Sequence, residues 1–134
     1  MRAHVILPGQ AEGRVLRLAE PLSFWGGVDA ATGTLADPRS PHHDQAIGGT
    51  ILMLPETRGS SSSSAVILEL LARGLAPAAL VLGRLDAILG LGILVAREMG
   101  WPTIPLFLLP AGDQAEFFDG ERLAIDENGM IERR

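Results

Sequence analysis

The sequence contains no cysteine. This absence excludes a disulfide framework, and it excludes any metal ion or cluster held by thiolates of this chain. It also agrees with a cytoplasmic location, which we expect for this protein. Lysine is absent too, so all 11 basic residues are arginine, against 16 acidic residues. The resulting net charge of −5 argues against a nucleic-acid-binding protein, whose binding surface would carry a basic patch.

Long hydrophobic runs are also missing. The longest uncharged apolar runs cover residues 74–83, 87–96 and 99–112. None approaches the roughly 20 residues that a helix needs to cross a bilayer, and the apolar stretch before Pro8 is too short for a secretion signal. Hydrophobic residues make up 47% of the chain and charged residues only 20%, a composition that argues against intrinsic disorder. We therefore expect a protein without membrane segments that folds as a single domain over residues 1–134.

Strand and helix patterns alternate along the chain. Five short apolar or alternating segments predict strands, at residues 4–8, 13–18, 50–55, 78–83 and 103–109. One helix is predicted after Gly59, and a second begins at Asp86 as its N-cap and ends near Gly100. A hairpin is predicted around residues 127–129. This order predicts an α/β domain with a mixed, largely parallel sheet and two main helices.

A run of five serines, Ser60 to Ser64, follows Gly59 and begins the first predicted helix. A single serine there would act as an N-cap, but each further serine costs about 0.5 kcal/mol of helix stability relative to alanine. The first turn of a helix offers unpaired N–H groups and a partial positive charge to an anion. Arg58 adds a planar guanidinium that suits a carboxylate or phosphate. The pattern predicts an anion site, and it is no Walker P-loop because no lysine follows the glycine.

The segment 20–49 is dense in Gly, Pro, Asp and Ser and predicts a long loop. Loops of this length inside a compact domain are uncommon and often functional. Within it, Trp25 precedes the pair Gly26 and Gly27. Two interpretations stay open: a tight turn with Trp25 packed on the core, or a loop that faces a substrate and a partner.

The neighbouring residues His42, His43 and Asp44 raise the question of a metal site. Adjacent side chains rarely point at one ion, and no third ligand is suitably spaced nearby. We therefore expect no metal site in this chain.

Three segments, PLSFWGGVDAATGTLADPRSP, PETRGSSSSS and GLAPAALVL, resemble the small swivelling domain of the aconitase X group of hydro-lyases. The similarity runs from about Gly9 to Pro110. Members of the group carry this domain fused to a large catalytic domain or encode it as a separate small subunit, and 134 residues resembles the separate form. The resemblance implies the swivelling β/β/α fold of the aconitase type.

The resemblance also implies a dehydratase in which this chain closes over a small hydroxy-acid substrate held by a large aconitase X subunit. In the wider aconitase superfamily a Gly-Ser-Ser-Arg turn supplies the serine that removes the proton, and the matching position here is Ser60. The arginine of this chain precedes the turn instead of following it. The residues that the resemblance places against the substrate are Arg58, Gly59, Ser61, Ser62, Ser64, Trp25, Gly26 and Gly27. The iron–sulfur cluster associated with the family is expected in the large subunit, because this chain has no cysteine.

Two substrates agree with the resemblance. Bacterial members dehydrate cis-3-hydroxy-L-proline to an enamine that becomes Δ1-pyrroline-2-carboxylate, and archaeal members dehydrate 5-phosphomevalonate. The uninterrupted GSSSSS, in place of a turn with a threonine and an inner glycine, favours the hydroxyproline branch. An alternative of another class is an anion-binding regulatory module without catalysis of its own.

Overall fold

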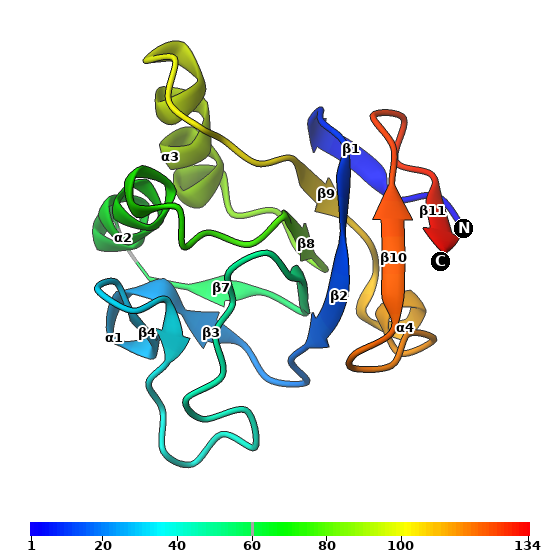
Figure 1. Cartoon of the computed structure of the whole chain (residues 1–134), viewed down its shortest axis with the longest axis horizontal. Coiled ribbons are helices and arrows are strands. Elements are labelled where there is room, and N and C mark those ends of the chain that lie inside the picture. Colours follow the sequence, from blue (N-terminus) through cyan, green and yellow to red (C-terminus); the bar gives the residue numbers. More distant parts are fainter. Residues whose placement is uncertain (60) are drawn as a thin grey trace.

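The computed structural model describes residues 1–59 and 61–134. Across these residues the main sheet has seven strands in the order β1-β9-β8-β6-β2-β10-β11 (Figure 1). The strands are β1 (His4–Leu7), β2 (Ala11–Arg17), β6 (Ile51–Leu54), β8 (Ala79–Leu82), β9 (Leu106–Leu108), β10 (Arg122–Ile125) and β11 (Ile131–Arg133). The central strands β9, β8, β6 and β2 are parallel, and antiparallel strands flank them on both sides. The predicted α/β fold with a mixed sheet is confirmed.

Two main helices, α2 (Ser61–Arg73) and α3 (Ala87–Glu98), connect β6 to β8 and β8 to β9. They lie against each other on one side of the sheet (Figure 1). The N-terminus of α3 forms as predicted, because Asp86 Oδ1 accepts hydrogen bonds from the backbone N–H groups of Ile88 and Leu89 at 3.0 and 3.1 Å. The two helices approach closely at Gly92, where an added Cβ would lie 3.0 Å from the Cγ2 atom of Ile67.

The core lies on both faces of the parallel strands. Alternate residues face α2 and α3, namely Leu52, Leu54, Leu80, Leu82 and Leu106. The residues between them pack on the other face, namely Ile51, Met53, Ala79, Val81 and Phe107. That second face is covered by side chains of the β10–β11 hairpin and by Phe117. Burial on both faces explains why the strands appear in the sequence as continuous apolar runs.

The segment 20–49 contains more regular structure than the predicted loop. Its elements are β3 (Leu22–Ser23), α1 (Phe24–Gly27), β4 (Val28–Asp29) and β5 (Thr34–Leu35). Strand β3 pairs in parallel with β7 (Thr57–Arg58), and β4 pairs with β5 as a hairpin. The α1 turn is interrupted, since Gly26 has a φ of 85°. Two-residue strands are too short to produce a hydrophobic period, so the sequence pattern could not predict them.

The chain ends lie close together (Figure 1). Arg2 forms a β-bridge with Met130, at the start of β11. The predicted hairpin is present, and Asp126 Oδ1 accepts hydrogen bonds from the backbone N–H groups of Asn128 and Met130 at 2.8 and 3.0 Å. A short helix, α4 (Ala111–Gln114), precedes the hairpin. Within residues 1–59 and 61–134, no helix combines the length and apolarity needed to span a bilayer.

Candidate functional site

The predicted site lies where the two main helices begin, beyond the carboxyl ends of β6 and β8. β7 and Gly59 lead into α2, and the segment from Gly83 to Asp86 leads into α3. A hydrogen bond of 2.6 Å joins these two connections, with Thr57 Oγ1 donating to Asp86 Oδ2. Because Asp86 also caps α3 with its other oxygen, its carboxylate fixes both helix starts relative to each other.

The predicted catalytic residue, Ser60, lies outside the described residues. The residue before it is tightly confined. Gly59 has a φ of 129°, and an added Cβ there would clash with the Oγ atom of Ser63 and lie 3.3 Å from the Oγ atom of Ser23. Both the backbone conformation and the lack of space therefore require glycine at this position.

The other serines of the run have different surroundings. Ser61 is exposed and Ser62 is half-buried. Ser63 is only 1% exposed, and its hydroxyl donates a long hydrogen bond of 3.5 Å to the carbonyl of Arg58. Ser64 Oγ donates to the carbonyl of Ile88 on α3 at 2.8 Å. Ser63 therefore stabilises the turn before α2, and Ser64 links α2 to α3. Ser61, in contrast, faces solvent.

Two guanidinium groups lie beside the turn and share one carboxylate. Arg58 Nη2 lies 3.9 Å from Glu56 Oε1, and Arg84 Nη1 lies 3.8 Å from Glu56 Oε2. The arginine side chains are 71% and 81% exposed, and such exposed ion pairs add little stability, so both guanidiniums can turn to an incoming anion. Arg84 was not among the predicted site residues. Its position after Gly83 and close before a helix, similar to that of Arg58, is the signal that could have identified it.

The loop that carries Trp25 lies beside this turn. Ser23 of β3 pairs with Arg58 of β7, and α1 contacts α2 (Figure 1). Trp25 is 65% exposed, whereas the preceding Phe24 is completely buried. The interpretation of Trp25 as a core residue is therefore wrong, because Phe24 occupies that place. The structure brings Trp25 to Gly27 next to the Arg58–Gly59 turn, with the indole in solvent.

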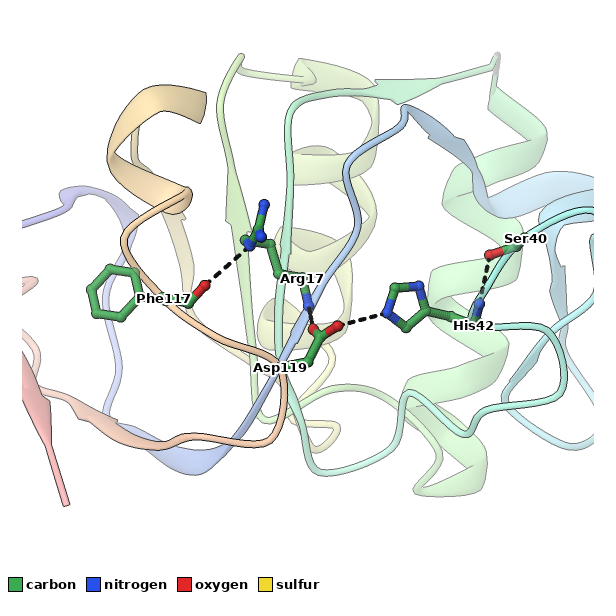
Figure 2. Close-up of polar contacts among 5 residues, drawn as sticks. All are labelled: Arg17, Ser40, His42, Phe117 and Asp119. Atoms are coloured by element: carbon green, nitrogen blue, oxygen red, sulfur yellow. Dashed lines mark hydrogen bonds and ion pairs between the residues drawn. The ribbon is translucent and has the colours of Figure 1, made fainter.

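A separate polar network connects three distant segments (Figure 2). Asp119 Oδ1 accepts from the backbone N–H of Arg17 at 2.6 Å, and Asp119 Oδ2 accepts from His42 Nε2 at 2.8 Å. Burial acts to raise the pKa of the Asp119 carboxyl, but these hydrogen bonds outweigh it and hold that pKa below its ordinary value. The network borders a cavity of about 610 Å³ that is lined in part by Arg39 and Leu22. Sequence patterns gave no signal of it, because His42 and Asp119 are 77 positions apart.

The histidine pair does not converge on one point. His42 binds Asp119, whereas His43 Nε2 lies 3.3 Å from Asp44 Oδ1. Among the residues that the structure describes, no three His, Asp or Glu side chains are grouped so that they could hold a metal ion. With no cysteine in the sequence, the chain does not offer the ligands that an iron–sulfur cluster needs.

Comparison with known proteins gives a consistent picture. The family model of the aconitase X swivel domain matches residues 1–133. The phosphomevalonate dehydratase small subunit of Thermococcus gammatolerans is 38% identical over 133 residues, covering 98% of this chain and 95% of that protein. The crystal structure of Thermococcus kodakaraensis aconitase X in its holo form superimposes with a TM-score of 0.86 at 32% identity, covering 99% of this chain and 96% of that one.

A second kind of relative is much longer. The cis-3-hydroxy-L-proline dehydratase of Pseudomonas aeruginosa is 40% identical over 112 residues, which cover 80% of this chain but only 19% of that protein. The chain thus spans about a fifth of the length of the curated cis-3-hydroxy-L-proline dehydratases that it matches.

Proposed function

Since the chain belongs to the aconitase X swivel-domain family, we propose that it is the small subunit of a hydro-lyase that removes water from a small hydroxy acid. A large aconitase X subunit completes the active site in this proposal. The observation that carries it is the serine-rich first turn of α2, flanked by the guanidiniums of Arg58 and Arg84. Eliminating water from a hydroxy acid requires a base near the acidic carbon and cationic groups around the carboxylate. In this proposal Ser60 is the base, and Arg58 and Arg84 are the cationic groups.

In the proposed reaction, the alkoxide of Ser60 takes the proton from the carbon next to the carboxylate, the electron pair of that C–H bond forms the double bond, and the C–O bond on the adjacent carbon breaks. The proton on Ser60 and the departing hydroxide together make the water that is released, which restores the alkoxide. A serine alkoxide needs a strongly stabilising site, which the N-terminus of α2 and Arg58 supply once the partner excludes water. Gly59 supports the role of its neighbour, because its conformation and confinement fix the backbone at the start of the turn.

The remaining site residues surround the substrate in this proposal. Their places around the turn support the assignment, with Ser61 exposed at the first position of α2 and Trp25 exposed on the adjoining loop. The residues proposed to contact substrate are Arg58, Gly59, Ser61, Ser62, Ser64, Trp25, Gly26 and Gly27. Ser64 Oγ already donates its proton to the carbonyl of Ile88, so in this proposal it contacts the substrate as a hydrogen-bond acceptor.

For the substrate we propose cis-3-hydroxy-L-proline, with Δ1-pyrroline-2-carboxylate as the product after the enamine rearranges. The charges beside the turn support this choice. Arg58, Arg84 and Glu56 together carry a net charge of about +1, which balances the carboxylate of this zwitterion and leaves its ring ammonium to groups of the large subunit. A phosphate monoester would bring a further charge of about −1.5 to −2.

A second candidate substrate is 5-phosphomevalonate. It is favoured by a different observation, since the phosphomevalonate dehydratase small subunit of Thermococcus gammatolerans matches this chain over nearly the full length of both. The additional cationic groups for the phosphate would then come from the large subunit.

The iron–sulfur cluster associated with the family belongs to the large subunit in this proposal. Residues of this chain bind and orient the carboxylate, exclude water and hold the proton at Ser60, and no step of theirs involves the cluster.

The test is reconstitution with the large aconitase X subunit of the same organism. We expect the isolated chain to fold but to turn over neither substrate, and the complex to dehydrate cis-3-hydroxy-L-proline with a kcat/KM at least tenfold above that for 5-phosphomevalonate. The reverse preference would assign the chain to the second substrate. Binding of the large subunit without turnover of any hydroxy acid would support a regulatory module instead.

A further inference from the structure

The helix α3 is apolar on all sides from its start to Ala96. It contains no charged residue between Asp86 and Arg97, and its inner residues are buried against α2 and the sheet. On its outer side Ile88, Leu91 and Val95 are 42%, 59% and 43% exposed. Their spacing of three and four positions places them in one stripe. A helix that is apolar all round is typical of a buried helix, yet this chain leaves one side of α3 in solvent.

This exposed stripe is much more apolar than the matching surface of the neighbouring helix. The α3 apolar face consists of Leu85, Ile88, Leu91, Leu94, Val95 and Met99. The outer side of α2 instead carries the exposed ion pair of Glu69 and Arg73, with 3.0 Å between their charged atoms. Contiguous exposed apolar patches on soluble proteins mark interaction sites, so the α3 apolar face indicates an interface.

We infer that the α3 apolar face is the surface on which the large aconitase X subunit docks, an inference that rests on the proposed function. Continuity with the proposed active site supports it. Ser64 Oγ binds the carbonyl of Ile88 at 2.8 Å, so the start of the face touches the first turn of α2. At a helical rise of about 1.5 Å per residue, Leu91 lies only about 5 Å further along the axis. A subunit that closes over the serine turn therefore reaches the face as well.

The length of the cis-3-hydroxy-L-proline dehydratases also supports the large subunit as the partner that covers the α3 apolar face. In two curated cis-3-hydroxy-L-proline dehydratases the matching segment is about a fifth of the chain, so a polypeptide about four times as long belongs to the same protein. A membrane surface fits poorly, because helices that bind membranes carry basic polar faces and this chain has a net charge of −5.

The experiment measures the affinity of this chain for the large subunit by isothermal titration calorimetry. Leu91→Lys should raise Kd about 30-fold or more, since it places an unpaired charge in a desolvated interface. Phe118→Lys is the matched control, because Phe118 is an equally apolar side chain, 70% exposed, in the connection from α4 to β10. It should leave Kd within about threefold of wild type. Activity lost by Leu91→Lys should return when the small subunit is supplied in large excess.

Val95→Lys provides a second variant, and circular dichroism of each isolated chain shows that α3 has formed. Unchanged affinity of Leu91→Lys and Val95→Lys in a complex that is active would overturn the inference and leave the proposed function standing. Failure of the wild-type chain to bind the large subunit would overturn both. An isolated chain that dimerises, and that becomes monomeric with Leu91→Lys, would assign the face to a second copy and also overturn the inference.

Discussion

Ser61 and Ser63 belong to the same helical turn, yet one hydroxyl is in solvent and the other is almost completely buried. The serines of this run therefore have different roles, although they are identical in sequence. Ser63 packs against Gly59 and fixes the turn, so its hydroxyl is inaccessible to a substrate. Only the residues on the outer side of the turn are accessible to a substrate.

Ser60→Ala in the assembled complex should lower kcat by about 10²- to 10⁴-fold, because general-base catalysis typically contributes that much. KM should change little, since the hydroxyl acts mainly as the proton moves. Ser63→Ala is the comparison variant. Its buried hydroxyl supports the turn without reaching a substrate, so steady-state kinetics should show a much smaller loss of kcat for it. If Ser60→Ala keeps more than about a tenth of the wild-type kcat, the base is another group.

The Asp119 carboxylate gives a pH-dependent contribution to stability. Its pKa is lowered in the folded protein, so its contribution is fully present above the unfolded value near 3.9 and is lost as pH falls through the folded value. Asp119→Asn should therefore be less stable than wild type at pH 7, and the difference should shrink as the pH falls below about 4. Urea unfolding across this range measures it. Glu127→Gln, an exposed residue of the hairpin turn, is the control, and a constant difference for Asp119→Asn would contradict the assignment.

At the scale of elements, the strands of the main sheet and the two main helices could be predicted from sequence, because apolar runs, alternation or turn residues mark them. The two-residue strands β3, β4, β5 and β7 carry no such mark and were missed. Asp86 was identifiable as an N-cap because that signal is local. The contacts between elements were not predictable. The pairing of β3 with β7 joins residues 35 positions apart (Leu22↔Thr57), and the Glu56–Arg84 pair depends on how β6 and β8 lie side by side. The serine turn was found because its composition is unusual. The weaker local signal of Arg84, which follows Gly83 and precedes a helix, was overlooked, and only its contact with Glu56 required the fold.

One buried side chain joins the short helix α4 to the carboxyl ends of β6 and β9. Gln114 Nε2 donates to the carbonyls of Leu54 and Leu109 at 3.0 and 2.9 Å. Gln114→Met should cost about 1–3 kcal/mol, because it removes donors from buried carbonyls. The free energy of unfolding in urea measures the loss. The exposed Gln45→Met should be nearly neutral, and equal stability of both variants would show that α4 contributes only apolar packing.

At the scale of the whole molecule, the chain ends lie on the opposite side from the start of α2 (Figure 1). An affinity tag at either terminus should therefore leave both Kd for the large subunit and kcat within about twofold of the untagged chain. Titration calorimetry and steady-state assays of the two tagged proteins test this. A tag at one end that blocks assembly would show that the large subunit extends around the edge formed by β11.

The same arrangement of the chain ends has a mechanical consequence for longer proteins that contain this domain. A connecting peptide attached at the chain ends would act as a pivot for the whole domain. The serine turn lies on the opposite side, roughly 30 Å from this pivot, which is the diameter of a domain of this size. A rotation of only about 10° around that pivot would then carry the serine turn about 5 Å, which is more than the length of a hydrogen bond. A small rotation about the connecting peptide would therefore be enough to open and close the space above the serine turn. The β-bridge between Arg2 and Met130 would keep the region around the chain ends rigid during this rotation.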